Sequence, residues 1–183
     1  MSVTSDPPAS PSLRLAQEPR MLSASLTYED VARAYVDRVY RFCFSFFRNS
    51  WDAADACQET FVAIGRNRHK LSGVEHLTPW VMTAAYRSCL WVRRKAIRSR
   101  EPAGAGEPEW SQPAEPLEGK EDMRTVREAI GRLPERYRTA LALKYQQNLD
   151  AEAMSAVLGI SRGALRVLLH RAVARLRQEV RSP

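Results

Sequence analysis

The sequence has no apolar run long enough to cross a membrane and no export signal. A membrane-spanning helix needs about 20 consecutive, mostly apolar residues, and the 183-residue sequence contains no such run. Its first residues, MSVTSDPPASPS, have neither the positive charge nor the apolar segment of a signal peptide. We therefore expect the protein to act in the cytoplasm.

Cysteine and histidine are also scarce, with three residues of each type. Cys43, Cys57 and Cys89 are widely spaced and form no C-x-x-C motif, which favours buried thiols over a redox pair or a zinc site. We also find no nucleophile–base pair, no metal-binding cluster and no phosphate-binding loop. The sequence thus predicts a protein that is not an enzyme and needs no cofactor or metal.

No segment alternates apolar and polar residues as a half-buried β-strand does. Apolar residues instead recur every three or four positions, which predicts helices over 27–49, 50–69 and 79–100. Residues 70–79 contain Ser, Gly and Pro and are predicted to form a loop. The apolar face of the first helix is predicted to contain Val31, Tyr35, Val39, Phe42 and Phe46.

Cap residues mark the starts of these helices. Thr27 and Asp30 have the spacing of a capping box, and Ser50 or Asp52 is a candidate cap for the second helix. Pro79 suits the first turn of the third helix. The buried face of the second helix is predicted to contain Ala54, Cys57, Phe61 and Ile64.

Proline and acidic residues divide the chain into two parts. Residues 1–25 are predicted to be a disordered tail, and 101–121 a flexible acidic linker with several prolines and glycines. Between and after them lie two predicted helical domains, 26–100 and 122–183. The fold class we expect is therefore all-α, with two small helical domains joined by a flexible linker.

The second domain has a helix-turn-helix pattern. A short helix over 150–158 is followed by Gly159, which allows a tight turn, and by Ser161 as the cap of a longer helix. Its apolar stripe is Leu165, Leu168, Leu169, Ala172 and Leu176. The opposite side holds Arg166, Val167, His170, Arg171, Ala174 and Arg177.

Positive charge is concentrated in two segments of the sequence. The chain has a net charge of +7 and a pI of about 9.7, and the segments 87–100 and 161–181 flank the acidic linker. A basic amphipathic helix can face water, lie on a membrane or bind DNA. The turn and short helix that precede the last basic segment favour DNA, and Tyr86 and Trp91 alternate with the arginines of the first.

Three segments, in this order, resemble one family. They are DAADACQETF (52–61) with its Gln-Glu pair, PWVMTAAYRSCLWVRRK (79–95) with its Trp and terminal arginines, and 129–176 with its Leu-Pro opening and helix-turn-helix. Together they resemble the extracytoplasmic-function (ECF, group IV) sigma factors of the bacterial sigma-70 family. The resemblance spans about residues 28–180 apart from the linker, and it implies a sigma region 2-like domain and a region 4-like domain.

The resemblance also implies a function and its partners. A sigma factor binds core RNA polymerase through the clamp and flap, recognises promoter DNA, opens the strands and starts transcription. The first domain is expected to bind the clamp and the −10 element, and the second domain the −35 element. A cognate anti-sigma factor is a further expected partner, whereas a small-molecule substrate and membrane insertion are not expected.

Site residues follow from matching positions. For the polymerase clamp, the resemblance implies Asp55, Gln58 and Glu59. For the −10 element, it implies the loop residues Ser72 and His76, with Ser72–Thr78 as the loop that receives a flipped base, together with Trp80, Arg87, Arg93, Arg94, Lys95 and Arg98. For the −35 element, it implies Arg162, Arg166, Val167, His170, Arg171 and Arg175.

Several residues depart from the family pattern. Ala56 and Gly65 reduce packing volume, Arg87 replaces a usual Asn, and Leu168 replaces a usual Arg. Val167, on the polar face, suits contact with a thymine methyl group. Two alternatives to a sigma factor stay open: a sigma-like decoy for an anti-sigma factor, and a helix-turn-helix regulator that binds DNA without polymerase.

Overall fold

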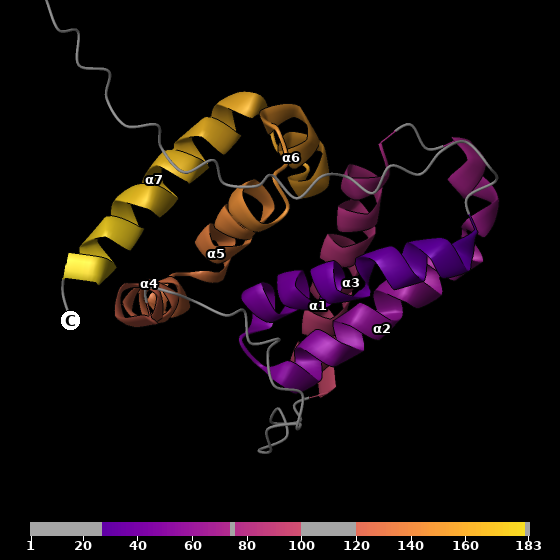
Figure 1. Ribbon diagram of the computed structural model, residues 1–183, viewed down its shortest axis with the longest axis horizontal. Helices are drawn as coiled ribbons and strands as arrows, with labels where there is room; N and C mark the ends of the chain where they lie inside the picture. Colours follow the sequence, from indigo (N-terminus) through magenta and orange to yellow (C-terminus); the bar gives the residue numbers. More distant parts are fainter. Residues whose placement is uncertain (1–26, 74–75, 100–119, 182–183) are drawn as a thin grey trace, which may run out of the picture.

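The computed structural model describes residues 27–73, 76–99 and 120–181, and the regular structure in these ranges is helical (Figure 1). The expected all-α class is confirmed. The predicted tail and most of the predicted linker lie outside the described residues. The elements are α1 Tyr28–Phe47, α2 Ser50–Arg66, a 3₁₀ helix Arg68–Gly73, α3 Leu77–Ser99, α4 Lys120–Arg132, α5 Glu135–Leu141, a π-helical turn Ala142–Gln146, α6 Ala151–Leu158 and α7 Arg162–Arg181.

Helix α1 begins and packs as its sequence predicts. The Thr27 hydroxyl accepts a hydrogen bond from the Asp30 backbone N–H, and the Asp30 carboxylate accepts one from the Thr27 N–H, each at 3.2 Å. The Thr27 hydroxyl also donates to the Asp30 carboxylate at 2.6 Å, and this side-chain hydrogen bond, followed by the one from the Thr27 backbone N–H, lowers the pKa of the Asp30 carboxyl. All of the predicted apolar face is buried: Val31, Tyr35, Val39, Phe42 and Phe46.

Helix α2 differs from its prediction at the cap and on one face. Asn49, and neither Ser50 nor Asp52, caps it: the Asn49 side-chain oxygen accepts from two backbone N–H groups at 2.8 and 3.2 Å. Ala54, predicted to be buried, is exposed, because the inward stripe falls one position away from it. The buried residues of α2 are Ala53, Ala56, Cys57, Thr60 and Ile64.

Residues 70–79 form less of a loop than predicted. A 3₁₀ helix covers Arg68–Gly73 with Leu71 buried, and α3 already begins at Leu77. Pro79 lies in the first turn of α3, as predicted. Thr78, which we considered for base binding, is buried and shares a 2.8 Å hydrogen bond with the Tyr35 hydroxyl. Its polar edge is therefore used inside the fold.

The helix-turn-helix is built as predicted. Asp150 caps α6, Gly159 ends it with a positive φ of 66°, and the Ser161 hydroxyl accepts from the Ala164 backbone N–H at 3.2 Å. Helix α4 starts two residues before the predicted position 122. The tight turn at Gly159 joins α6 to α7, which pack against each other as the two helices of a helix-turn-helix.

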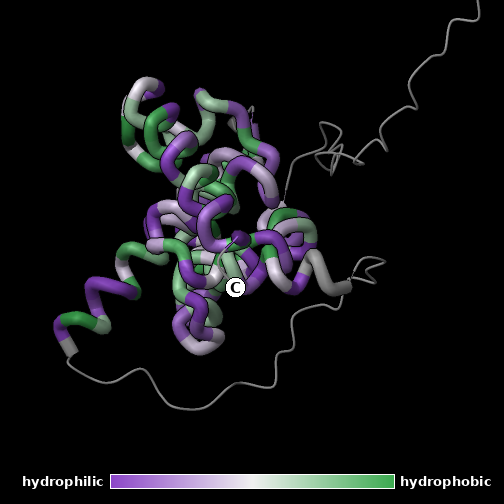
Figure 2. The backbone as a smooth tube through the Cα atoms, turned by 90° about the vertical axis from the view of Figure 1, so that its left-hand side faces the viewer, coloured by the Kyte–Doolittle hydropathy of each residue, from purple (hydrophilic) through white to green (hydrophobic). Residues whose placement is uncertain are grey.

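The two predicted helical parts share one hydrophobic core. Helices α1 and α2 lie side by side, α3 crosses them, α5 and α6 pack on this layer, and α7 packs on α4, α5 and α6 (Figure 1). Along each helix, apolar segments alternate with polar ones (Figure 2). Buried residues of the C-terminal half join the cluster of α1–α3: Ala142, Leu143, Leu149, Met154, Val157 and Leu165. A smaller cluster of Leu133, Leu141 and Ala172 joins α4, α5 and α7.

The three cysteines are buried and free, as predicted. Cys43 and Cys89 lie across α1 and α3 with their sulfurs 3.6 Å apart. Within the described ranges, no helix is both long and apolar enough to span a bilayer.

Candidate nucleic-acid interface and docking surface

Helix α7 presents one apolar and one basic side. Leu165 and Ala172 are fully buried against the core, which fixes the rotation of the helix. The opposite side exposes all the predicted reading residues at its centre: Arg166, Val167, His170 and Arg171. Val167 is 45% exposed, so an apolar side chain stands among cations on the face that a major groove would contact.

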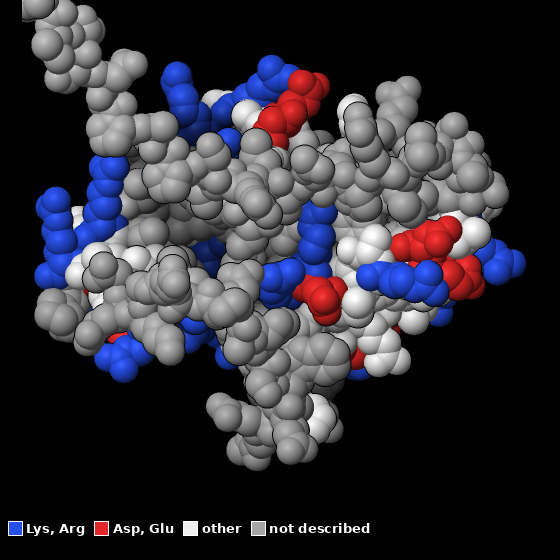
Figure 3. Space-filling view, viewed as in Figure 1, with Lys and Arg blue, Asp and Glu red and all other residues white. Residues whose placement is uncertain are grey.

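The flanking arginines of α7 are paired on the surface. Arg162 forms a 2.6 Å ion pair with Glu152, and Arg175 forms a 2.8 Å ion pair with Glu179. Both side chains of the Arg162–Glu152 pair are exposed, and such a pair contributes little stability, so an anion such as a phosphate can replace Glu152 at low cost, whereas Glu179 is mostly buried. In the space-filling view, Lys and Arg side chains gather on the α7 side of the molecule, whereas both signs mix on the opposite side (Figure 3).

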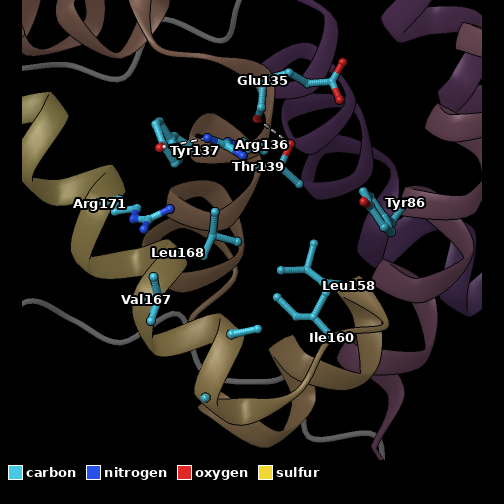
Figure 4. A pocket seen from close by; sticks show the side chains of 12 residues that line it. Tyr86, Glu135, Arg136, Tyr137, Thr139, Leu158, Ile160, Val167, Leu168 and Arg171 are labelled. Carbon is cyan, nitrogen blue, oxygen red and sulfur yellow. Dashed lines mark hydrogen bonds between the residues drawn. The ribbon is translucent and has the colours of Figure 1, made fainter.

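A cavity of about 520 Å³ lies beside the basic face. Val167, Leu168 and Arg171 line it from α7, and Tyr86 lines it from α3 (Figure 4). Burial raises the pKa of the Tyr86 hydroxyl. Val167 and Arg171, in the middle of the predicted reading face, therefore lie across the cavity from α3 of the same chain.

Helix α3 carries the predicted −10 residues in different settings. Arg87, Arg94 and Arg98 are exposed along one side, while Trp80 is half-buried against the core. Arg93 does not stand free: its guanidinium lies 2.6 Å from Glu135 of α5. His76 is exposed, and the side chain of Ser72 lies outside the described residues.

Lys95 connects α3 to α2 and also lies over the ring of Trp91 on its own helix. The Lys95 ammonium lies 5.2 Å from the centre of the Trp91 ring and 4.0 Å from the Asp55 carboxylate. A cation over an aromatic face is attracted by the ring quadrupole. Lys95, predicted to bind DNA, and Asp55, predicted to bind polymerase, therefore lie next to each other at the border of two surfaces.

Helix α2 has an exposed stripe larger than the predicted docking residues. Gln58 is exposed, and Asp55 and Glu59 are partly exposed. Trp51, 52% exposed, and Val62, 37% exposed, extend the stripe at both ends. The positions 51, 55, 58 and 62 are three or four residues apart, so they share one face of the helix. This spacing was present in the sequence, but the Gln-Glu motif alone did not include Trp51 and Val62. An exposed tryptophan beside carboxylates is typical of a protein-binding surface.

The departures Ala56 and Gly65 do not disrupt α2. The helix continues through both positions, and Ala56 is completely buried. A Cβ at Gly65 would lie 3.4 Å from the Tyr28 ring, so the aromatic ring from α1 fills the space beside the glycine. Arg87 and Leu168 differ in exposure: Arg87 is exposed and Leu168 is partly buried.

Among the described residues, no group of three or more His, Cys, Asp or Glu side chains is placed to hold a metal ion. The geometry instead supplies two kinds of surface. One consists of the cations of α3, with Tyr86 and Trp91 among them, and the cations of α7, and the other is the polar stripe of α2 with its exposed tryptophan.

Both halves of the chain match known families. Residues 31–99 match the family described as Sigma-70 region 2, and residues 123–176 match Sigma-70, region 4. The chain is 26% identical over 170 residues to the ECF RNA polymerase sigma factor SigW of Bacillus subtilis (strain 168), covering 84% of this chain and 89% of SigW. It is 29% identical over 156 residues to the RNA polymerase sigma factor CarQ of Myxococcus xanthus, covering 82% and 87%.

The chain therefore belongs to the sigma-70 family, within its ECF class. Solved structures share its fold. The sigma factor RpoE in complex with the anti-sigma factor NepR from Bartonella quintana has a TM-score of 0.62 at 15% identity, covering 85% of this chain and 97% of that one. CnrH, in complex with the cytosolic domain of CnrY, has a TM-score of 0.55 at 19% identity, covering 82% and 85%.

Proposed function

We propose that this chain is an RNA polymerase sigma factor that binds the core enzyme, recognises a two-element promoter and directs strand opening and initiation. The observation that carries this proposal is the combination, in one chain, of the exposed α2 stripe, the basic aromatic side of α3 and the helix-turn-helix. A DNA-binding regulator that works without polymerase needs only the last of these. The family matches to both regions support the same function.

Helix α2 is the proposed polymerase-docking surface. Asp55, Gln58 and Glu59 supply polar and negative groups, and the exposed ring of Trp51 supplies an apolar anchor. Such a centre of one aromatic residue with surrounding polar groups is typical of protein interfaces. The partner we infer is the clamp of core RNA polymerase.

The unit of residues 26–100 is the proposed −10 reader. Arg87, Arg94 and Arg98 are placed to hold phosphates, contacts that give affinity and salt dependence without sequence preference. Exposed Trp91, with Lys95 above its ring, offers a stacking surface for an unpaired base. We infer the same role for His76 and Trp80 at the start of α3, and for Ser72 before it.

The unit of residues 122–183 is the proposed −35 reader. Arg166 and Arg171 can each pair with the O6 and N7 atoms of a guanine, and Val167 can contact a thymine methyl group. His170 completes the reading face, while Arg162 and Arg175 lie at its flanks for phosphates. This division makes residues 101–121 the tether between the two readers.

We further infer a cytoplasmic anti-sigma factor as the regulator. One structural neighbour, the sigma factor RpoE, is in complex with the anti-sigma factor NepR, and another, CnrH, is in complex with the cytosolic domain of CnrY. The proposed role is that of an initiation factor that acts in the cytoplasm by binding and has no catalytic step of its own.

Polymerase binding tests the proposal directly. We expect the full chain to bind core RNA polymerase, and Gln58→Ala with Trp51→Ala to weaken binding at least tenfold by removing the polar centre and the apolar anchor of the stripe. Fluorescence anisotropy with labelled chain measures the affinity. Val180→Ala, at another exposed apolar residue, on α7, is the control and should bind normally. A chain that does not bind core polymerase at all contradicts the proposal.

A further inference from the structure

The cavity beside α7 is large enough for a small organic molecule. Its volume of about 520 Å³ lies within the range of roughly 300–1,000 Å³ that is usual for ligand pockets. Its walls come from α3, from α5, and from α6 and α7 with the turn between them (Figure 4). Ligand pockets often lie where two packed units meet, and this cavity has walls from both helical halves of the chain.

Apolar side chains form much of the wall. Leu158 and Ile160 line the cavity from the end of α6 and the turn, and Val167 and Leu168 line it from α7 (Figure 4). Val167 is 45% exposed, so apolar surface at this cavity is in contact with water. A ligand that removes such surface from water gains free energy in proportion to the apolar area buried.

Two small residues at the start of α7 leave room inside the cavity. Both Gly163 and Ala164 line it. A Cβ at Gly163 would meet only the Ser161 hydroxyl oxygen, at 3.9 Å, and the side chain of Ala164 is a single methyl group. A flat ring can therefore lie against this turn of the helix, where larger side chains would fill the space.

Two tyrosine rings line the same cavity, Tyr86 from α3 and Tyr137 from α5. The Tyr86 ring packs edge-on against Phe46, with the ring centres 6.3 Å apart, and the Arg136 guanidinium lies 4.8 Å from the centre of the Tyr137 ring. These contacts restrict the orientation of both rings. Because aromatic groups prefer offset or edge-on contacts with one another, such walls favour an aromatic ligand over a flexible chain.

Most polar groups of the walls already have partners within the chain. The Glu135 carboxylate pairs with Arg93 at 2.6 Å, and the Thr139 hydroxyl donates to the Glu135 backbone carbonyl at 2.9 Å. The Arg136 guanidinium donates to the Tyr137 hydroxyl at 3.1 Å. A ligand therefore needs few polar atoms of its own to match these walls.

Two hydrogen-bond donors of the walls are still available. Within the part of the chain that the structure describes, the Tyr86 hydroxyl and the Arg171 guanidinium make no hydrogen bond or ion pair. Burial raises the pKa of the Tyr86 hydroxyl, so this group keeps its proton at neutral pH and can donate it. Arg171 supplies a positive charge and a planar set of N–H donors. A carboxylate accepts hydrogen bonds from both kinds of donor.

We propose that this cavity binds a planar aromatic carboxylate, whose rings lie among the apolar and tyrosine side chains and whose carboxylate accepts hydrogen bonds from Arg171 and Tyr86. The site itself rests on the lining of the cavity. Its effect rests on the proposed function: a ligand in this cavity occupies Val167 and Arg171, two residues that we propose to read the −35 element. Promoter recognition then depends on the concentration of the ligand.

Binding of 2-naphthoate to the full chain tests the site. This probe has two fused rings and one carboxylate, and 2-naphthamide is its uncharged counterpart of nearly the same shape. We expect a dissociation constant of about 1 mM or below for 2-naphthoate, as is usual for so small a ligand, measured by isothermal titration calorimetry. The amide should bind roughly fivefold more weakly, because it gives Arg171 no ionic partner. Equal affinities for the two probes would overturn the proposal.

Two matched pairs of variants locate the probe. Arg171→Met should abolish the preference for 2-naphthoate over 2-naphthamide, whereas Arg177→Met, at an exposed arginine of α7 outside the cavity, should keep it. Ala164→Leu fills part of the cavity and should weaken both probes roughly tenfold, whereas Ala174→Leu, at an exposed alanine outside the cavity, should not. Circular dichroism checks that each variant is folded. Equal effects within either pair would place the probe elsewhere and overturn the site.

Transcription measures the effect on promoter recognition. In run-off transcription with core polymerase, 2-naphthoate at about ten times its dissociation constant occupies about 90% of the sites and should lower the yield severalfold. Sodium acetate at the same concentration is the control for ionic strength and should have no such effect. The yield with Ala164→Leu should be the same with and without 2-naphthoate, which controls for an effect on polymerase itself. An unchanged yield with the unsubstituted chain would overturn the regulation.

The calorimetry contains neither polymerase nor promoter, so it tests the ligand site whatever the transcription assay gives. A chain that binds 2-naphthoate in the expected pattern but gives no transcript without it contradicts the proposed function alone. A chain that directs transcription but does not bind 2-naphthoate contradicts the ligand site alone.

Discussion

At the scale of single residues, Val167 is the most informative position on the proposed DNA-binding surface. It is 45% exposed and lies between Arg166 on one side and His170 and Arg171 on the other, on the basic side of α7. Lys95, by contrast, is held between a tryptophan ring and a carboxylate at the border of α2 and α3. We propose base reading as the role of Val167 and backbone binding as the role of Lys95.

Val167→Ser is expected to change promoter preference at one base pair of the −35 element, because it removes a methyl contact and adds a hydrogen-bonding group. Transcription from a set of −35 variants measures this preference. Lys95→Ala is the comparison, and it should weaken all promoters alike and reduce the salt dependence. An equal loss on all −35 variants for Val167→Ser would contradict the methyl contact.

Cys57 provides a prediction about pH. Burial raises the pKa of its thiol to about 11, and the thiolate is the form that reacts with disulfide reagents. At pH 8 we therefore expect the folded chain to label roughly a hundredfold more slowly than the unfolded chain, whose thiols titrate near 8.5. The rate of labelling is measured from the absorbance of the coloured product that the disulfide reagent releases.

The raised pKa of Cys57 also sets how the free energy of unfolding depends on pH. Because the thiol is deprotonated at a lower pH in the unfolded chain, the contribution of Cys57 to stability is complete below the unfolded pKa. This contribution is lost as the pH rises toward about 11. Fast labelling of the native chain at pH 8 would show that Cys57 is not buried as described.

At the scale of elements, the turn of the helix-turn-helix depends on backbone conformation. Gly159 has a φ of 66°, a region that costs a residue with a Cβ about 1 kcal/mol or more. Gly159→Ala is expected to lower the free energy of unfolding by about this amount, as measured by urea denaturation. Gly163→Ala, in the first turn of α7, meets only the Ser161 hydroxyl at 3.9 Å and should raise stability by up to about 1 kcal/mol. If both variants change the free energy of unfolding in the same direction, the left-handed backbone conformation at Gly159 is contradicted.

Local signals in the sequence were enough for most elements. The apolar face of α1, the capping box at Thr27, the turn at Gly159 and the cap at Ser161 were all predicted and are all present. These features depend on residues within one or two helical turns of each other, so the sequence contains them directly.

The errors have a common cause. Asn49 was overlooked as a cap because Ser50 and Asp52 are equally good capping residues, and the choice depends on how the chain leaves α1 through Arg48, which has a positive φ of 59°. Thr78 was considered for base binding because its partner, Tyr35, lies 43 positions away in the sequence. Long-range partners are not visible in local patterns.

At the scale of the whole molecule, local sequence patterns do not reveal that the two helical halves pack on each other. Helical periodicity predicts which side of α5 is apolar. It does not predict that this helix packs on α1, or that Arg93 forms an ion pair with Glu135. The roles proposed for the individual site residues, in binding polymerase or DNA, stay predictions. The contacts between the two halves show that Arg93, one of the residues predicted to bind DNA, is paired with Glu135.

The central claim is that the chain makes RNA polymerase competent for promoter-specific initiation. The most direct test is run-off transcription with core polymerase, the full chain and DNA fragments, followed by mapping of the start sites. We predict discrete transcripts whose start sites follow a shared two-element sequence, and their loss when either element is scrambled. Core polymerase that gives the same start sites with and without the chain would contradict the account.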